Sequence, residues 1–185
     1  MVELVSTRVV SVTTLAADAG LGALYAVLDA CDEPRVPAKV RELGPELAMS
    51  LYRGSAESDL AAIAPYLVRV TPDVLRWITE SFWGDPWGIF AVSDAPIEEL
   101  RTHFRKFLLI EAPDGDSWYF RFYDPRVLAK WLPGCDHAQL SEFLGPVSSY
   151  AWTDTETYGV TFASQNWFEQ TPVPPAKPRI VFRRQ

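Results

Sequence analysis

The sequence has only two cysteines and two histidines among its 185 residues. Cys31 and Cys135 lie far apart and outside any pair motif, so they form neither a disulfide framework nor a cysteine-rich zinc site. His103 and His137 do not have the spacing of a helical metal-binding pair. We therefore expect no bound metal, and a protein that folds in a reducing compartment.

Long apolar runs are missing as well, since none approaches the roughly 18 residues that a membrane span needs. Glu3 stands where a secretory signal carries positive charge. No expected helix follows a phosphate-binding loop of the G-x-G-x-x-G or G-x-x-x-x-G-K-[ST] type. These absences predict a cytoplasmic protein with no membrane contact and no cofactor.

Positive charge is scarce, because 17 Lys and Arg residues face 24 Asp and Glu residues and leave a net charge of −7. A tail at residues 171–185 carries four of the basic residues, so residues 1–176 have a charge of −11. Such a body repels a phosphate backbone, which argues against nucleic acid as a partner. The tail is also proline-rich and is expected to lack regular structure.

The remaining composition, 48% apolar and 22% charged residues, is that of a globular protein. A chain of this length buries about 70% of the surface that its unfolded form exposes, which is enough for a stable core without disulfide bonds or structural metals. We expect one domain over residues 1–170, followed by the tail at 171–185.

Hydrophobic periodicity and turn residues predict alternating strands and helices. The expected helices begin after capping or proline residues, with Thr71, Asp94, Asp124 and Asp136 as caps. The expected strands cover residues 8–14, 23–30, 47–52, 66–70, 87–92, 108–112, 118–123, 147–152 and 158–162. The expected helices cover residues 36–43, 72–82, 96–107, 125–132 and 136–143. An Asp-Gly hairpin at 114–115 and short connections favour the α+β (mixed α/β) class, with a mixed, mostly antiparallel sheet and packed helices.

Acid–base chemistry would need paired carboxylates, and Asp29 with Asp124 is the candidate pair. The alternative is structural, because Asp29 closes a turn after its strand and Asp124 caps the helix that Pro125 begins. Cys31 has acidic neighbours, which disfavour a reactive thiolate, so we expect a small buried side chain. His103 is expected to be a hydrogen-bonding residue on the surface of its helix.

The densest cluster of functional side chains is the segment RFYDPR at 121–126. If it begins as a strand, Arg121 and Tyr123 share one face and Phe122 lies on the other. We expect Arg121 to pair with Asp124 at the corner between strand and helix. Such a corner, continued by Pro125 and Arg126, would either lock the fold or present a charged edge to a partner.

Seven tryptophans exceed the usual need of one small core. Trp is enriched at interfaces because it buries a large area at little entropic cost. Trp83 and Trp87 flank a Gly-Asp-Pro turn, and Trp167 and Phe168 precede the tail. These four residues are the candidates for an exposed aromatic patch.

A series of motifs resembles the bacterial type VI secretion effector-adaptor family, whose members are also called effector chaperones. The motifs are YAVLDA (25–30), APYLV (64–68), WGIFAVSDAPIEELRTHFRKFL (87–108), DG (114–115), RFYDPRVL (121–128) and FLGPV (143–147). They span residues 22–152. The resemblance implies a non-enzymatic protein that binds one toxic effector in the producing cell and helps to mount it on the VgrG spike.

The resemblance also implies which positions shape the family's fold. In this chain they are Asp29, Trp87, Gly88, Arg121, Asp124, Pro125, Arg126, Gly145 and Pro146. Many members continue into a variable helical C-terminal region linked to the choice of effector, whereas this chain is short after Trp152. Partner recognition is then expected on the domain itself, on strands 147–162 or on the basic tail. The alternatives are a general protein-interaction or small-molecule-binding domain, or a hydrolase using Asp29 and Asp124.

Overall fold

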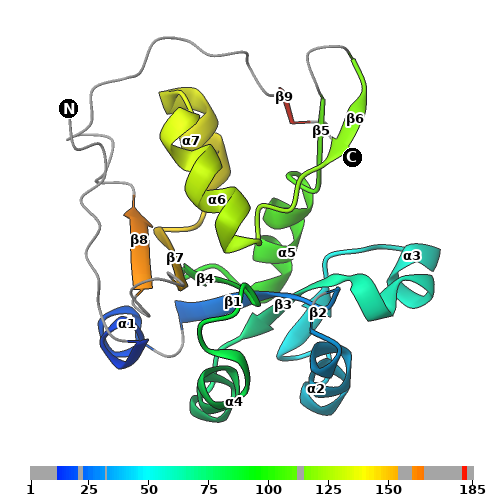
Figure 1. The fold of residues 1–185 in the computed structure, drawn as a ribbon, viewed down its shortest axis with the longest axis vertical. Helices are drawn as coiled ribbons and strands as arrows, with labels where there is room; N and C mark the ends of the chain where they lie inside the picture. Colours follow the sequence, from blue (N-terminus) through cyan, green and yellow to red (C-terminus); the bar gives the residue numbers. More distant parts are fainter. Residues whose placement is uncertain are drawn as a thin grey trace.

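The computed structural model describes residues 12–20, 23–31, 33–111, 115–153, 160–164 and 181–182. Two layers of helices enclose a central sheet, and a small second sheet stands beside it (Figure 1). The helices are α1 (Val12–Ala19), α2 (Arg35–Leu43), α3 (Ser55–Asp59), η2 (Ala61–Ile63), α4 (Pro72–Phe82), α5 (Ile97–Arg105), α6 (Pro125–Trp131), η3 (Leu132–Gly134) and α7 (His137–Leu144). The strands are β1 (Leu24–Asp29), β2 (Ala48–Ser50), β3 (Pro65–Arg69), β4 (Gly88–Val92), β5 (Leu109–Glu111), β6 (Ser117–Tyr119), β7 (Ser149–Thr153), β8 (Val160–Ser164) and β9 (Val181–Phe182).

The central sheet has six strands in the order β2-β3-β1-β4-β7-β8, and the second sheet has the order β6-β5-β9. Every strand pair found among the described residues is antiparallel. The α+β class with a mostly antiparallel sheet is therefore confirmed. The Asp-Gly hairpin is confirmed too, because β5 and β6 pair on either side of residues 114–115.

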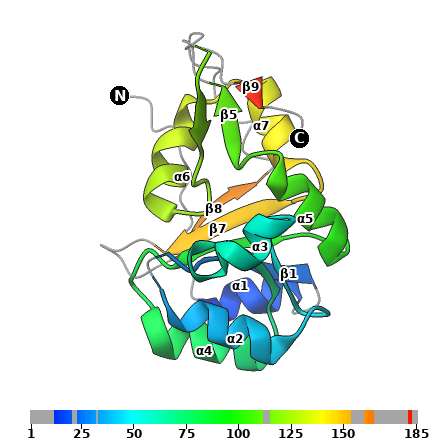
Figure 2. The same ribbon diagram turned by 90° about the vertical axis from the view of Figure 1, so that its right-hand side faces the viewer.

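Strand β1 lies at the centre of the large sheet, and all six of its residues are buried. Its side chains alternate between two cores, as a strand's geometry requires. Tyr25 and Val27 face the core beneath α5, α6 and α7, whereas Leu24, Ala26 and Leu28 face the core beneath α1, α2 and α4. Figure 2 shows the sheet between these two helical layers. The continuous apolar run at 24–28 is thus the sequence signature of a strand covered on both faces.

The core beneath α5, α6 and α7 is built largely from aromatic rings. Phe143 contacts four of them, with centroids 4.7 to 5.7 Å away: Tyr150, Trp131, Phe107 and Phe122. Most of these pairs have edge-to-face geometry, which is the favoured arrangement of aromatic quadrupoles. This packing fixes α7 against β7 and against the turn at 120–124.

Three of the predicted helix caps are present. The Thr71 hydroxyl accepts from the Val74 amide at 3.2 Å, and Asp136 forms a capping box with Gln139. Asp124 caps α6, with Pro125 in the first helical turn. The fourth expectation is wrong, because α5 begins after Pro96 and Asp94 makes no cap. The ring of Pro96 fixes its own φ angle at the start of the helix, so α5 begins without a side chain that accepts a capping hydrogen bond.

The strand expected at 8–14 is also wrong where the structure describes it, because residues 12–19 form helix α1. The β-branched residues at 12–14 suggested a strand, but the following segment LAADA has high helix propensity. Leu15 and Ala16 are buried in the second core, so tertiary packing favours the helix. The short helices α3 and η2, between β2 and β3, were not expected.

His103 is a third correction, because its side chain is buried and not on the helix surface. Its Nε2 lies 2.9 Å from the Phe143 carbonyl, and its ring packs against Phe107. A Cβ on Gly145 would come within 2.4 Å of the ring, so a glycine is required above it. Burial lowers the pKa of His103 to about 4, despite the hydrogen bond to Phe143.

The buried imidazole predicts a specific acid sensitivity. The unfolded chain binds a proton at His103 near pH 6.5, whereas the folded chain does so only near pH 4. The contribution of the neutral His103 to the free energy of unfolding is therefore fully present above pH 6.5. It is lost as the pH falls toward 4, by about 3 kcal/mol at most. Urea unfolding at pH 7 and pH 4.5 should show this loss. His103→Gln should reduce it, and an unchanged pH dependence in that variant would contradict the assignment.

Gly88 provides a test of the contact between β1 and β4. A Cβ at this position would lie 2.1 Å from the Val27 carbonyl oxygen. Gly88→Ala should therefore destabilise the protein by about 3 kcal/mol through overpacking. Gly44→Ala is the matched control, because its φ is also positive but nothing lies within 4 Å of the added carbon. That control should cost less in urea unfolding, because it adds only the backbone strain of a glycine conformation and no steric overlap. Equal losses would argue against the close approach at Gly88.

Candidate functional site

Asp29 ends strand β1 and is completely buried. Its Oδ1 accepts the Cys31 amide at 3.0 Å, and its Oδ2 accepts a hydrogen bond from Arg121 Nη2. The Arg121 side chain is 34% exposed, so one end of this ion pair reaches solvent. The pair joins the end of the central strand to the turn at 121–124, which is 92 residues further along the chain.

Asp124 belongs to a second, adjacent ion pair. Its carboxylate accepts the Arg126 amide at 2.9 Å, Nε at 2.9 Å and Nη2 at 2.7 Å. Burial raises the pKa of Asp124, but the hydrogen bonds from Arg126 outweigh this effect, so the pKa lies below its usual value. Asp124 therefore stays ionised as cap and ion-pair partner at neutral pH, a state that suits neither a general acid nor a strong base.

Arg121 thus pairs with Asp29, a partner that the sequence did not predict, and its positive charge also lowers the pKa of Asp124. The expected Arg121–Asp124 pair stays a prediction. Residues 121–124 form a turn and not a continuation of the strand, which ends at Tyr119. The turn buries Phe122 and Tyr123 together and leaves Arg121 half-buried, so the alternating faces expected there are wrong. Sequence spacing showed the local Asp124 cap, but it contained no signal for the distant partner Asp29.

Three tyrosines extend the corner toward solvent. The hydroxyls of Tyr119 and Tyr123 lie 3.3 Å apart, and the rings of Tyr52 and Tyr119 meet edge to face with centroids 6.3 Å apart. Burial raises the pKa of Tyr123, and the nearby Asp29 carboxylate raises it further. The Tyr123 phenol therefore remains protonated at neutral pH. Together with Asp29 and Arg121, the three tyrosines connect β1, the 121–124 turn and strand β6.

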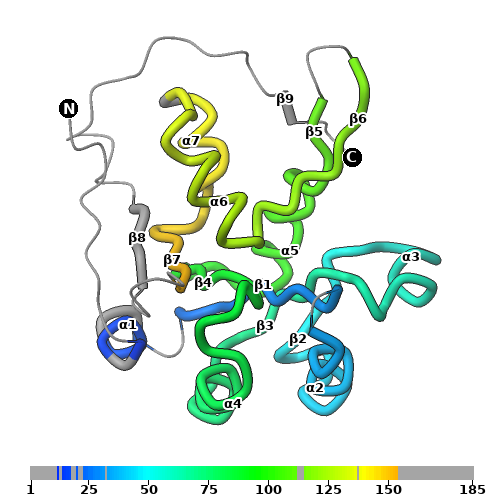
Figure 3. Tube along the Cα trace, in the orientation of Figure 1, coloured from blue at the N-terminus to red at the C-terminus, as the bar shows by residue number. Residues whose placement is uncertain are grey.

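Strand β6 is exposed at all three residues and occupies the end of its sheet. Trp118 is 54% exposed and Tyr119 is 43% exposed. The Phe120 amide donates to the Leu108 carbonyl, so in the alternating ladder Ser117 and Tyr119 turn their backbone groups away from β5. Figure 3 shows the hairpin of β5 and β6 rising on the right, above α3. We call Ser117–Tyr119 with Tyr52 and Arg121 the hairpin surface.

The tryptophans that the sequence analysis expected on an exposed patch are not part of the hairpin surface. Trp87 is only 2% exposed and packs against Phe82 and Phe90, so its place in an exposed patch is wrong. Trp83 is half-buried beside the same core. Trp167 and Phe168 lie outside the described residues. The position of Trp87 beside the Gly-Asp-Pro turn therefore does not make it exposed, because the sheet and α4 cover its side chain.

The remaining chemical candidates have ordinary surroundings. Cys31 is exposed and not buried as expected, because it lies beyond the C-terminal end of strand β1. Within the part of the chain that the structure describes, no group of three or more His, Cys, Asp or Glu residues is placed to hold a metal. None of the described helices has the length and apolar character needed to cross a bilayer.

The fold and its corner define a class of protein: a layered α+β domain with an antiparallel sheet and a surface corner of arginine-held carboxylates and exposed aromatic rings. The model of a family described as a domain of unknown function, DUF4123, matches residues 24–142. This match covers more than half of the chain, so the chain belongs to the DUF4123 family. No curated protein and no solved structure matches it.

The ion pair between Asp29 and Arg121 can be tested by a double-mutant cycle. Asp29→Asn and Arg121→Gln should each destabilise the protein by about 2 to 3 kcal/mol, because each leaves a buried or half-buried partner unpaired. The double variant should lose less than the sum of the two single losses. Arg76→Gln, on an exposed arginine of α4, is the control and should change stability little. Additive losses in urea unfolding would contradict a direct pair.

Proposed function

We propose that this protein is a non-enzymatic adaptor, or chaperone, that binds a type VI secretion effector in the cytoplasm of the producing cell. In this role it helps to load the effector onto the VgrG spike and is not itself exported. Membership of the DUF4123 family and the motif series at 22–152 support the proposal. The observation that carries it is the hairpin surface, where exposed aromatic side chains stand on a rigid support.

Trp118 and Tyr119 have the composition expected of an anchor for a protein partner. Aromatic residues dominate the energetic centres of interfaces, and Trp118 and Tyr119 expose one aromatic ring on each face of β6. The outward backbone groups of β6 add hydrogen-bonding positions for an extended segment of the effector. An interface built around this strand would bury roughly 1,200–2,000 Å² in total.

The state of the two aspartates favours binding over catalysis. Asp29 is held by Arg121, and Asp124 is held by Arg126 and by the start of α6. A hydrolase would need one of these carboxyl groups to be free to accept or give a proton near a second titratable group. Here both serve to brace the surface, and Arg121 remains partly exposed to select a partner by charge.

Co-expression with the protein encoded by the neighbouring gene tests the proposal. The two chains should co-elute, and the neighbour should lose solubility when produced alone. Trp118→Ala should weaken the complex by about thirtyfold, as expected for an aromatic hot spot. Ile63→Ala is the matched control, because Ile63 is 45% exposed on η2 and lies outside the hairpin surface. Affinity measured by biolayer interferometry should be unchanged in that control.

A neighbour that is soluble alone and never elutes with this chain would contradict the adaptor function. Equal effects of Trp118→Ala and Ile63→Ala would leave the adaptor function in place but would place the effector on another surface.

A further inference from the structure

Strand β9 lies in the tail that the sequence analysis expected to lack regular structure. Its two residues pair with β5 in the antiparallel direction, with Val181 opposite Glu111 and Phe182 opposite Ile110. The expectation is therefore wrong at these two residues, because β-branched and aromatic residues follow the prolines there. Strand β9 is thus the third strand of the sheet that carries the hairpin surface (Figure 1).

Strand β9 covers the outer edge of β5. The Phe120 amide donates to the Leu108 carbonyl, so the alternating ladder turns the backbone groups of Ile110 toward β6. The amide and carbonyl of Glu111 then face Val181. Without β9 this edge would present unpaired backbone groups, which pair readily with another extended chain. The edge is therefore a position for strand docking, and a two-residue strand of the same chain fills it.

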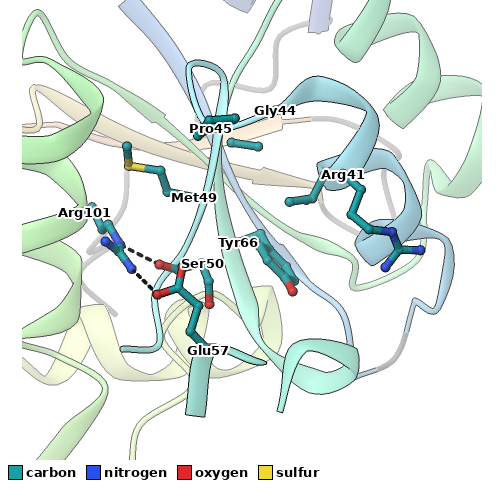
Figure 4. Close-up of a pocket in the computed structure, with 10 residues that line it drawn as sticks. Arg41, Gly44, Pro45, Met49, Ser50, Glu57, Tyr66 and Arg101 are labelled. Carbon is teal, nitrogen blue, oxygen red and sulfur yellow. Dashed lines mark hydrogen bonds and ion pairs between the residues drawn. The ribbon is translucent and has the colours of Figure 1, made fainter. Parts of the chain in front are cut away.

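One edge of the central sheet is closed in a different way. Strand β2 lies at that edge, and Arg101 Nε donates to the Ser50 carbonyl at 2.6 Å (Figure 4). The Ala48 amide donates to the Gly44 carbonyl at 3.0 Å. Contacts from the body of the domain therefore block strand addition at β2, whereas two residues of the tail cover the edge of β5. Few hydrogen bonds hold so short a strand, so it opens at a low free energy.

The charges of the two paired segments are complementary. Residues 109–117, from β5 to the start of β6, include three acidic residues and no lysine or arginine. The tail at 171–185 includes four basic residues and no acidic one. Such complementarity favours, at the edge of β5, a segment in which basic residues flank apolar ones. Strand β9 has this pattern, because Arg179 precedes and Arg183 follows its apolar residues.

We propose that the outer edge of β5 is a binding site for an extended segment of apolar residues flanked by basic ones, and that β9 occupies it until such a segment of a partner replaces it. Either segment pairs with the same backbone groups of Glu111, so the exchange forms as many hydrogen bonds as it breaks. The flanking charges then provide the selectivity. Assigning the incoming segment to the effector rests on the proposed function, whereas the exchange itself is tested without the effector.

The test uses the full-length protein and a fluorescent peptide with the sequence of residues 177–185. Val181→Pro removes the amide that faces Glu111, so β9 of this variant no longer competes for the edge. In fluorescence anisotropy, the peptide should bind this variant about tenfold more tightly than the unchanged chain, because a tethered strand competes at a high effective concentration. Added salt should weaken the binding. Val173→Pro is the matched control, because it adds a proline to the same tail outside β9, and it should behave as the unchanged chain does.

Hydrogen exchange at single amides gives a second readout. The Glu111 amide should exchange about tenfold faster in Val181→Pro than in the unchanged chain, since its partner strand is gone. The Ile110 amide, which faces β6, should keep its exchange rate. Adding the peptide to the variant should restore the protection of Glu111.

Equal peptide binding by the unchanged chain and by Val181→Pro, or an unchanged exchange rate at Glu111, would overturn the inference. The same effect in Val173→Pro would also overturn it. So would a dimer of the unchanged chain that Val181→Pro converts to a monomer, because β9 would then join two copies. A failure here with intact co-elution of the effector would remove the strand exchange and keep the adaptor function. Strand exchange without co-elution would do the reverse.

Discussion

The ion pair between Asp29 and Arg121 is the contact on which the hairpin surface depends. Asp29 is the one charged residue of a central strand that is otherwise apolar and covered on both faces. A carboxylate at zero exposure needs a cationic partner and hydrogen bonds, and Arg121 with the Cys31 amide provides them. The ion pair therefore holds the 121–124 segment against the sheet. This segment lies between β6 and α6 in the chain, so it positions both elements.

The same constraint explains why aromatic rings can remain exposed on β6 without making the strand unstable. The Tyr119 ring packs against Tyr52, and its hydroxyl lies close to that of Tyr123. Tyr123 is buried beside the Asp29 ion pair. The edge of the small sheet is therefore held by the large one. A surface that is rigid before binding loses little entropy when a partner docks, which is the physical advantage of such a corner for an adaptor.

Much of the fold could be predicted from the sequence, because the signals are local. The run at 24–28, the Thr71 and Asp136 caps and the Asp-Gly turn each specify one element through its own residues. The errors arise where distant packing decides. Helix α1 overrides β-branched residues by burying Leu15, and His103 is covered by Phe143 from far along the chain. Trp87 is buried against its neighbours Phe82 and Phe90, although the turn beside it favours exposure. For the site, Asp29 and Arg121 could be nominated singly, but their pairing crosses 92 residues and has no sequence pattern. Trp118 was missed because its strand was assigned to a longer, regular element.

The proposed adaptor function requires this protein to hold another protein against its hairpin surface. Hydrogen exchange of the full-length chain, alone and with the protein encoded by the neighbouring gene, measures this directly. We expect the backbone amides of residues 117–119 to become protected in the complex, together with those of the 121–124 turn. Protection confined to other parts of the chain, or none at all while the complex is intact, would contradict it.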